Sequence, residues 1–568
     1  MKMDAKLHKA LLLVCALGVL CGSSFIDKSA AQTAKQSDRI VDMATAQNWR
    51  EDLRYFASEM PKRHKNLFHV MTREEFELAV RRLDEQIPRL TQEQIVVELQ
   101  RIVAMIRDGH TRIQDFPFGP KIGFHSYPVY LYQYKDGLFV QAAGPAYKDA
   151  VGARVIKIGK DSAQQAIDAV SPLVCRDGDN DMSIEAIAPS FLVTPEILHA
   201  LGIVDDPENA AFVVERNGRQ QTVNLKPSAD QLIANHGPTW RKPANWIDAR
   251  DGARAPTPLW LKYPQDFFWF EYLTELRTVY FQYNIIANKE NETVAEFAKR
   301  LFDFLDTHPV DRFVIDLRLN GGGNNFLNRP LLLGIIRTTK IDQPGKLFAI
   351  IGRQTFSAAQ DFVDELENYT NVTFVGEPTG ESPNQFGDPA SVVLPNSGIT
   401  VRASTLWWQF VDPRDTRKWT GPKIAAELTS EDYRNNIDPA MDAILKYVPK
   451  KELVVQMREA LDANQTAQAI AAYRAFKSNP QNQYVETEAS LNRLGYELMA
   501  RKKYSQAIEI LKLNVESYPQ SANVYDSLGE AYMMNGEKEL AIKNYEKSLS
   551  LNPVNEGAAA ALKKLRGN

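Results

Sequence analysis

The strand-like stretch Arg312-Phe313-Val314-Ile315-Asp316-Leu317-Arg318 runs almost directly into the loop Asn320-Gly321-Gly322-Gly323. Helical periodicity precedes it over Thr293 to Thr307, and further apolar strands are predicted at Lys346 to Ile351 and Val372 to Val375. Strands that alternate with helices in this way predict an α/β layer structure.

The composition sets the broad class of the protein. The chain has 568 residues, of which 44% are hydrophobic and 24% charged. This is ordinary globular composition, which excludes a disordered or fibrous protein, and the length predicts roughly four folding units. The 67 Lys and Arg residues against 71 Asp and Glu give a formal charge of −4, without a clustered basic stripe. A nucleic-acid partner is therefore not expected.

The first 31 residues have the layout of a secretory signal peptide. The apolar run Ala10 to Leu20 follows three lysines and is too short to span a bilayer. We predict cleavage after Ala31 and export to the periplasm or the exterior. A lipid anchor at Cys21 is the alternative, disfavoured because the preceding Leu20 is not small. Cleavage leaves Cys175 as the single cysteine, so no internal disulfide is expected and this residue is interpreted as passive.

Residues 32–115 are predicted to form an N-terminal helical domain. The helix predicted from Leu90 to Ile106 opens with Thr91 in a capping-box arrangement. It leads into Asp108-Gly109-His110-Thr111, a sharp exit that can project the histidine into a neighbouring cleft.

The pattern then changes to the alternation of β-strands. Two hairpins, with turns at Asp136-Gly137 and Asn217-Gly218, predict a small β domain over residues 116–228. Residues 229–275 are rich in Pro and Trp and are interpreted as a connecting segment. The α/β core is expected over residues 276–450.

The C-terminal part contains an internal repeat. Three features recur at a spacing of 34 residues, which is the tetratricopeptide period: Leu494-Gly495 with Leu528-Gly529, Ala507-Ile508 with Ala541-Ile542, and Pro519 with Pro553. We therefore predict tetratricopeptide repeats over residues 485–568, preceded by a helical linker at 451–484. The repeats serve either as a helical cap on the core or as a docking surface for a protein partner.

The glycine loop and Ser357 are the first candidates for chemistry. Three consecutive glycines let backbone N–H groups approach a bound group, which suits an oxyanion hole at Gly322 or Gly323 better than a phosphate site, since no Walker or dinucleotide pattern is present. A tight turn alone is the structural alternative. Ser357 precedes a helix, where it is either an N-cap or a nucleophile whose next backbone N–H, at Ala358, completes the oxyanion hole.

A serine nucleophile needs a base, and the chain offers few. No lysine occurs between Lys346 and Lys418, and no histidine follows His308. An imidazole base must therefore come from upstream, and His110 is the best-placed candidate because of its position at a helix exit.

Four motifs, in this order along the chain, resemble those of the tail-specific (C-terminal processing) serine peptidases: Asp108-Gly109-His110-Thr111, Asp316-Leu317-Arg318 with its glycine loop, Thr355-Phe356-Ser357-Ala358-Ala359, and Gly376-Glu377-Pro378-Thr379-Gly380. The resemblance covers roughly residues 40–450. It implies a multidomain α/β protein with an N-terminal helical segment, a PDZ-like β domain, and a crotonase-like (ClpP-type) spiral α/β catalytic core, here followed by an α-solenoid.

The chain departs from the processing branch of that family at one position. That branch uses a Ser–Lys dyad, and Ser382 stands where its lysine is expected. The sequence instead resembles the tricorn-core branch, which implies Ser357 as nucleophile, His110 as base and a late acidic residue that orients the histidine. Asp415 is the preferred candidate for this acid and Asp412 the second.

These observations predict an exported serine peptidase that hydrolyses peptide bonds of proteins or peptides. No cofactor is expected, and no metal either, because the His and Cys spacings contain no ligand cluster. The alternative is a catalytically degenerate peptidase fold that acts as a binding or scaffold protein through its repeats.

Overall fold

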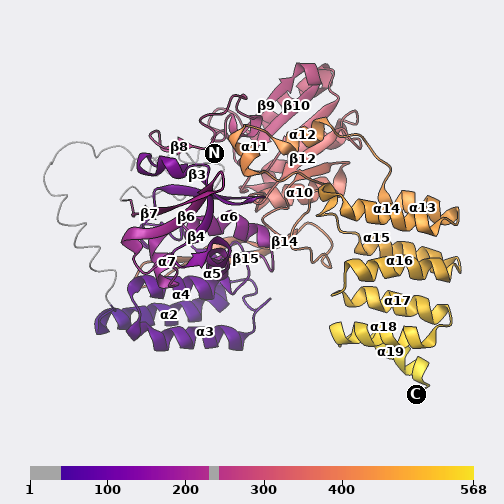
Figure 1. The fold of residues 1–568 in the computed structure, drawn as a ribbon, viewed down its shortest axis with the longest axis horizontal. Helices are drawn as coiled ribbons and strands as arrows, with labels where there is room; N and C mark the ends of the chain where they lie inside the picture. The colour runs from indigo at the N-terminus through magenta and orange to yellow at the C-terminus, as the bar shows by residue number, and fades with distance from the viewer. Residues whose placement is uncertain (1–39, 229–241, 568) are drawn as a thin grey trace, which may run out of the picture.

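The computed structural model describes residues 40–228 and 242–567 (Figure 1). The predicted signal peptide, with Cys21 and Ala31, lies outside these residues. The described chain is a mixed α/β protein with N-terminal helices, β-sheets and a C-terminal stack of helices, so the predicted fold class is confirmed at this level.

The N-terminal helices are built on clear capping signals. In the capping box predicted at Thr91, its hydroxyl accepts from Gln94 N at 3.3 Å and its own N–H donates to Gln94 Oε1 at 3.0 Å. Such caps satisfy backbone donors that a helix N-terminus leaves unpaired. The elements are α2 (Met43–Arg63), α3 (Arg73–Gln86), η1 (Ile87–Arg89) and α4 (Gln92–Ala104).

A seven-stranded antiparallel sheet forms the β domain. The path β2-β3-β4-β6-β7 contains the two predicted hairpins, while β5 pairs with β4 and β8 with β3. Two helices between β5 and β6, α6 and α7, go beyond what the sequence periodicity predicts. The elements are β2 (Val129–Tyr134), β3 (Gly137–Ala143), η2 (Pro145–Ala150), β4 (Arg154–Ile158), β5 (Asp161–Ser162), α5 (Ala163–Val170), η3 (Ser171–Leu173), α6 (Asp181–Phe191), α7 (Pro195–Ala200), η4 (Pro207–Asn209), β6 (Ala210–Arg216), β7 (Arg219–Leu225) and β8 (Ile247–Asp248).

The α/β core is a six-stranded sheet covered on both faces. Its order is β16-β13-β12-β11-β10-β9, parallel throughout except for the edge strand β9. Phe313 and Ile315 of β11 pack on one face in a cluster with residues of α8, α9 and α10, whereas Val314 faces α12 on the other. Successive side chains of a strand point to opposite faces, so a strand that is buried on both faces is apolar at every position.

The core elements have these bounds: η5 (Leu259–Leu261), β9 (Phe268–Leu273), η6 (Thr274–Leu276), β10 (Thr278–Tyr283), α8 (Val294–Thr307), β11 (Arg312–Asp316), η7 (Asn325–Asn328), α9 (Arg329–Arg337), β12 (Leu347–Ile351), α10 (Ala358–Tyr369), β13 (Thr373–Gly376), β14 (Asn384–Val393), β15 (Thr400–Gln409), β16 (Ile424–Ala425), α11 (Ser430–Arg434) and α12 (Pro439–Leu445). The sheet begins at β9, so the core starts earlier than the boundary expected at residue 276. The physical reason is that β9 and β10 form one antiparallel pair that cannot be divided between domains.

A long hairpin ties the core to the N-terminal helices. Strands β14 and β15 leave the core as an antiparallel pair, and β15 also pairs with the short strand β1 (Arg112–Ile113), in register Ile113 with Val401. Val401 and Ala403 are buried in the same apolar cluster as α4. Because β1 begins two residues after His110, this pairing fixes the segment that carries His110 against the core.

The C-terminal helices stack beside the core and extend away from it (Figure 1). Helices α15 and α17 begin 34 residues apart, at Glu488 and Ala522, as the repeat period predicts. The predicted linker 451–484 is itself part of the stack, because Met457 and Tyr473 are buried in the same apolar cluster as the repeats. The elements are α13 (Leu453–Asp462), α14 (Thr466–Ser478), η8 (Pro480–Asn482), α15 (Glu488–Ala500), α16 (Tyr504–Ser517), α17 (Ala522–Met534), α18 (Lys538–Leu551) and α19 (Glu556–Arg566).

Candidate active site

Ser357 lies at the N-terminus of α10 in an unusual backbone conformation. Its φ is +58° and its ψ is −134°, a region that residues with a side chain rarely adopt and that costs about 1–3 kcal/mol. Its hydroxyl makes no capping hydrogen bond to the helix. The position is thus an N-cap, but the side chain is turned away from that role and is available for other contacts.

Gly322 lies directly against this serine. A Cβ added at Gly322 would come within 2.6 Å of Ser357 Cβ and 2.8 Å of the Phe356 carbonyl oxygen. The backbone there also has a φ of +100°. Only glycine fits both the close approach and the dihedral angle, so this part of the glycine loop is more than a simple turn.

His110 meets Ser357 across 247 positions of sequence, with His110 Nε2 3.0 Å from Ser357 Oγ. The turn after α4 delivers the imidazole, and the pairing of β1 with β15 holds that turn against the core. Gly109 permits the approach, because a Cβ there would lie 2.9 Å from the Phe356 ring. The structure therefore brings together the two residues that the sequence singled out.

The acid beside the histidine is Glu381. Its Oε1 lies 3.0 Å from His110 Nδ1, and its side chain has no exposed surface. Its other oxygen accepts a short hydrogen bond from the backbone N–H of Ser357. Among the described residues, neither His110 Nδ1 nor Glu381 Oε1 has a hydrogen-bond partner of good geometry, so what links the two atoms is their separation of 3.0 Å.

The prediction that Asp415 or Asp412 orients the histidine is therefore wrong. The Asp415 carboxylate pairs with Arg417 at 2.8 Å and that of Asp412 with Arg414 at 2.6 Å. A carboxylate already neutralised by a neighbouring guanidinium on a partly exposed loop is not available to a buried imidazole. The sequence patterns above do not indicate Glu381. The signal that could have identified it is its position directly after the motif Gly376-Glu377-Pro378-Thr379-Gly380.

Burial shifts the proton affinities of this pair in opposite directions. It lowers the pKa of His110 below its usual 6.5, against the opposing effect of nearby Asp108 and Asp177. It raises the pKa of Glu381 well above its usual value. Both shifts disfavour the charged forms. A neutral imidazole with a free Nε2 is the form that can accept the serine proton.

A second, buried set of side chains positions His110. The Asp108 carboxylate accepts from the His110 backbone N–H at 2.8 Å and from Thr111 Oγ1 at 2.6 Å, and it lies 2.8 Å from His64 Nε2. Despite burial, the hydrogen bonds from His64 and Thr111 lower the pKa of Asp108. From the β domain, Asp177 accepts from Gly109 N at 2.8 Å. Hydrogen bonds to Asp108 and Asp177 thus hold the turn that carries the imidazole, and His64 in turn contacts Asp108.

The predicted oxyanion hole is changed in one member. The N–H of Gly322 already donates to Asn320 Oδ1 at 2.9 Å, so Gly322 is wrong as a donor to substrate and instead makes room for Ser357. In the described part of the chain, the N–H groups of Gly323 and Ala358 donate to no protein acceptor. Ala358 follows Ser357 directly and Gly323 follows the glycine that contacts Ser357, so these two donors remain the candidates.

Further findings concern Cys175, clusters of metal-ligating side chains and membrane-spanning helices. Cys175 is free and buried, its Sγ accepts from Gln100 Nε2 at 3.3 Å, and burial raises its pKa to about 12, which fits a passive residue. Within residues 40–228 and 242–567, no cluster of three or more His, Cys, Asp or Glu side chains could hold a metal ion. In the same residues, no helix combines the length and apolar character needed to cross a bilayer.

Comparisons with known proteins give a family match at the C-terminus and similarity of fold elsewhere. Residues 522–553 match the tetratricopeptide repeat family. No curated protein matches the chain. Among solved structures, mature CPAF complexed with lactacystin is similar at a TM-score of 0.47 and 13% identity, over 74% of this chain and 100% of that one.

Two further solved structures are similar at lower scores. The photosystem II D1 C-terminal processing protease has a TM-score of 0.33 and 13% identity, covering 71% of this chain and 97% of that one. The tricorn protease has a TM-score of 0.33 and 14% identity, covering 70% of this chain and 36% of that one. The tetratricopeptide repeat match falls on α17 and α18.

Proposed function

We propose that this protein is a serine peptidase with Ser357 as nucleophile, His110 as general base and Glu381 as the acid that orients the histidine. The observation that carries the proposal is the contact of 3.0 Å between His110 Nε2 and Ser357 Oγ, made by residues from two domains. The strained backbone of Ser357 and its unused capping role support it, because strain persists where function requires a side chain to be presented.

The reaction follows from the positions of these groups. Ser357 Oγ attacks the carbonyl carbon of a peptide bond while its proton passes to His110 Nε2. The negative charge that develops on the carbonyl oxygen is stabilised by the N–H groups of Gly323 and Ala358, each worth about 2.7–4 kcal/mol in comparable sites. The imidazolium then gives its proton to the leaving amine. A water molecule, activated by the same imidazole, hydrolyses the acyl-enzyme and restores the serine.

Glu381 acts through His110 in this scheme. It faces the Nδ1 side of the ring at 3.0 Å, which leaves Nε2 for the serine, and as the carboxylate it stabilises the imidazolium that forms during attack. Its hydrogen bond from the Ser357 backbone also ties the acid to the nucleophile's own loop.

We further propose that the protein is exported, that its substrate is a protein or peptide, and that the repeats dock a protein partner. Export is supported by the signal-like residues 1–31. Docking is supported by the tetratricopeptide repeat match at residues 522–553 and by the separate apolar core of the helix stack.

Covalent labelling tests the peptidase proposal against a degenerate, binding-only protein. We expect a fluorophosphonate probe to label the wild-type chain once, at Ser357, and not to label Ser357→Ala. Mass spectrometry of the labelled peptide identifies the site. A native protein that takes no label, or a label that persists in Ser357→Ala, would contradict the proposed nucleophile.

The pH dependence of kcat/KM tests the base. Protonation of His110 removes the free Nε2, so activity should fall on acidification, and because burial lowers this pKa the midpoint should lie below 6.5. Above that midpoint the imidazole is neutral and the rate should reach a plateau. A rate that climbs steadily towards alkaline pH, as a lysine base gives, would exclude the histidine mechanism.

A further inference from the structure

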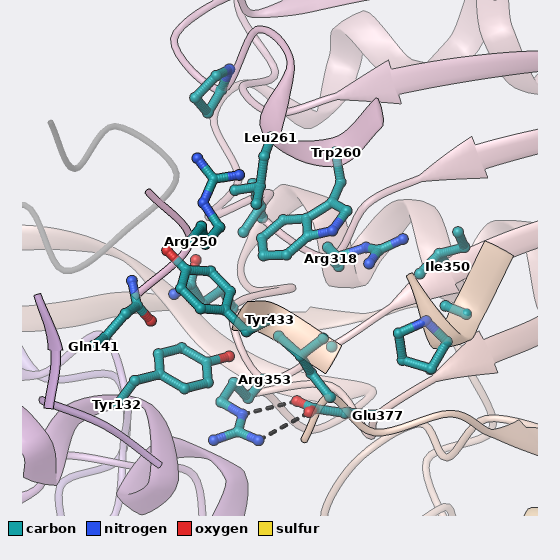
Figure 2. A pocket seen from close by; sticks show the side chains of 18 of the residues that line it. Tyr132, Gln141, Arg250, Trp260, Leu261, Arg318, Ile350, Arg353, Glu377 and Tyr433 are labelled. Atoms are coloured by element: carbon teal, nitrogen blue, oxygen red, sulfur yellow. Dashed lines mark hydrogen bonds and ion pairs between the residues drawn. The ribbon is translucent and has the colours of Figure 1, made fainter. Parts of the chain in front are cut away.

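A cavity of about 390 Å³ lies where the β domain, the segment after it and the α/β core meet (Figure 2). It shares no lining residue with the proposed catalytic triad. Its volume falls in the range of about 300–1,000 Å³ that is typical of small-molecule sites, and such sites are common at domain interfaces.

The cavity lies at the carboxyl ends of three adjacent parallel strands. Arg318 follows β11, Arg353 follows β12 and Glu377 follows β13, and all three line the cavity. In open α/β sheets, this edge is where ligands bind, because the loops that leave the strands there form a crevice.

Aromatic rings and arginines together form its walls. Figure 2 shows the ring of Trp260 above and to the right of the Tyr433 ring, with Tyr132 below them. Three guanidinium carbons lie close to ring centroids: Arg318 at 5.2 Å from Trp260, Arg353 at 5.4 Å from Tyr132, and Arg250 at 5.5 Å from Tyr433. The walls therefore offer flat apolar surface edged by positive charge.

Arg250 is the least neutralised of these three arginines. Arg318 lies 2.9 Å from Asp438, and Arg353 lies 2.8 Å from Glu377. Arg250 Nε is 3.8 Å from its nearest carboxylate, Asp248, and makes no hydrogen bond among the described residues. Its Nη1 donates only a long bond of 3.4 Å to Asn436.

Two further lining residues hold buried donors without a partner. In the described chain, Trp260 Nε1 and Gln265 Nε2 make no hydrogen bond, as is also true of Arg250 Nε. Among the described side chains that line the cavity, Gln354 alone presents an unpaired buried acceptor. Buried polar groups in native proteins are normally paired, so three unpaired donors against one acceptor indicate a ligand rich in acceptor oxygens.

We propose that this cavity binds a small organic carboxylate with a planar aromatic ring. The carboxylate pairs with Arg250, and the ring packs between Trp260 and Tyr433. A cationic ligand is disfavoured because it would face Arg250, and Arg318 already lies over the ring of Trp260. The proposal stands on the cavity alone and does not depend on the peptidase function.

Isothermal titration of 2-naphthoate, with the isosteric neutral 2-naphthamide as comparison, tests the proposal. Titrations use the full chain carrying Ser357→Ala, so that no turnover at the proposed active site contributes heat. We expect 2-naphthoate to bind at one site and 2-naphthamide to bind at least tenfold more weakly, because the amide lacks the charge that Arg250 recognises.

Two variants and a matched control locate the site. Arg250→Met should weaken naphthoate binding at least tenfold. Arg300→Met is the control, because Arg300 also lies over aromatic rings, at 5.0 Å from both Phe270 and Phe297, but outside the cavity. It should bind like the parent. Trp260→Phe keeps an aromatic ring but loses the indole N–H, and should weaken binding less than Arg250→Met does.

The outcomes separate clearly. Equal affinity for the acid and the amide, no measurable binding of naphthoate, or equal loss in the Arg250 and Arg300 variants would overturn the proposal. Melting temperatures establish that each variant is folded. If Arg250→Met does not fold, Trp260→Phe tests the proposal instead. Unchanged affinity for naphthoate in Trp260→Phe would then show that the ligand binds elsewhere.

Discussion

Ser357→Ala is expected to lower kcat for peptide cleavage by about 10⁶-fold, the loss seen when the nucleophile of a comparable triad is removed. Among the described residues, the hydroxyl makes its contact with His110 and none with the helix it precedes, so little stability is lost with it. Alanine meets the same backbone strain as serine at this φ. The melting temperature should therefore shift by no more than a few degrees.

A neighbouring serine provides the control for this variant. Ser382 Oγ donates to the Lys418 carbonyl oxygen at 3.2 Å and does not contact His110. Ser382→Ala should keep activity close to that of the wild type. Steady-state kinetics and thermal unfolding of the two variants decide the matter. Undiminished turnover in Ser357→Ala would show that Ser357 is not the nucleophile. A large loss of stability in this variant would instead indicate that Ser357 acts as a structural helix cap.

Glu381→Gln is expected to lower kcat by about 10³–10⁴-fold, close to the cost of neutralising the acid of a comparable triad. Glutamine keeps the size of the side chain and can still accept the hydrogen bond from Ser357 N, but it cannot stabilise the imidazolium by charge. The acid limb of the pH profile should also move to lower pH, because glutamine, unlike Glu381, cannot become a carboxylate opposite the imidazolium. A purely structural role for Glu381 would not move this midpoint.

Asp415→Asn is the matched control for the acid. Its carboxylate pairs with Arg417, which also contacts Glu367 at 2.7 Å, on a part of the chain that does not contact His110. Activity and the acid limb should both stay unchanged in this variant. The result that contradicts the structural assignment is the reverse: an inactive Asp415→Asn enzyme together with an active Glu381→Gln enzyme.

Local patterns in the sequence were enough to predict much of the architecture. The apolar run that contains Phe313 and Val314 predicts a two-faced buried strand, and the structure places these residues on opposite faces. The capping box at Thr91 and the period of 34 residues likewise report interactions between residues near each other in the chain. Such features depend on backbone geometry over a few residues or on one repeated unit. The spacing of residue types along the chain is therefore enough to predict them.

Local sequence signals predict the two residues that meet at the candidate site. Ser357 was indicated by its place between a strand and a helix, and His110 by the shortage of other bases and its position at a helix exit. Their contact at 3.0 Å depends on β1 pairing with β15 and on the burial of β15 among the N-terminal helices.

Which acid lies beside His110, and which glycine N–H is free to donate a hydrogen bond to substrate, depends on packing between distant segments. Glu381 and Asp415 are both acids downstream of Ser357, and spacing does not distinguish a carboxylate buried beside an imidazole from one paired with an arginine. Gly322 and Gly323 are adjacent, yet the first N–H is taken by Asn320. The physical reason is the same in both cases: availability of a polar group depends on burial and on competing partners, which distant segments supply through packing.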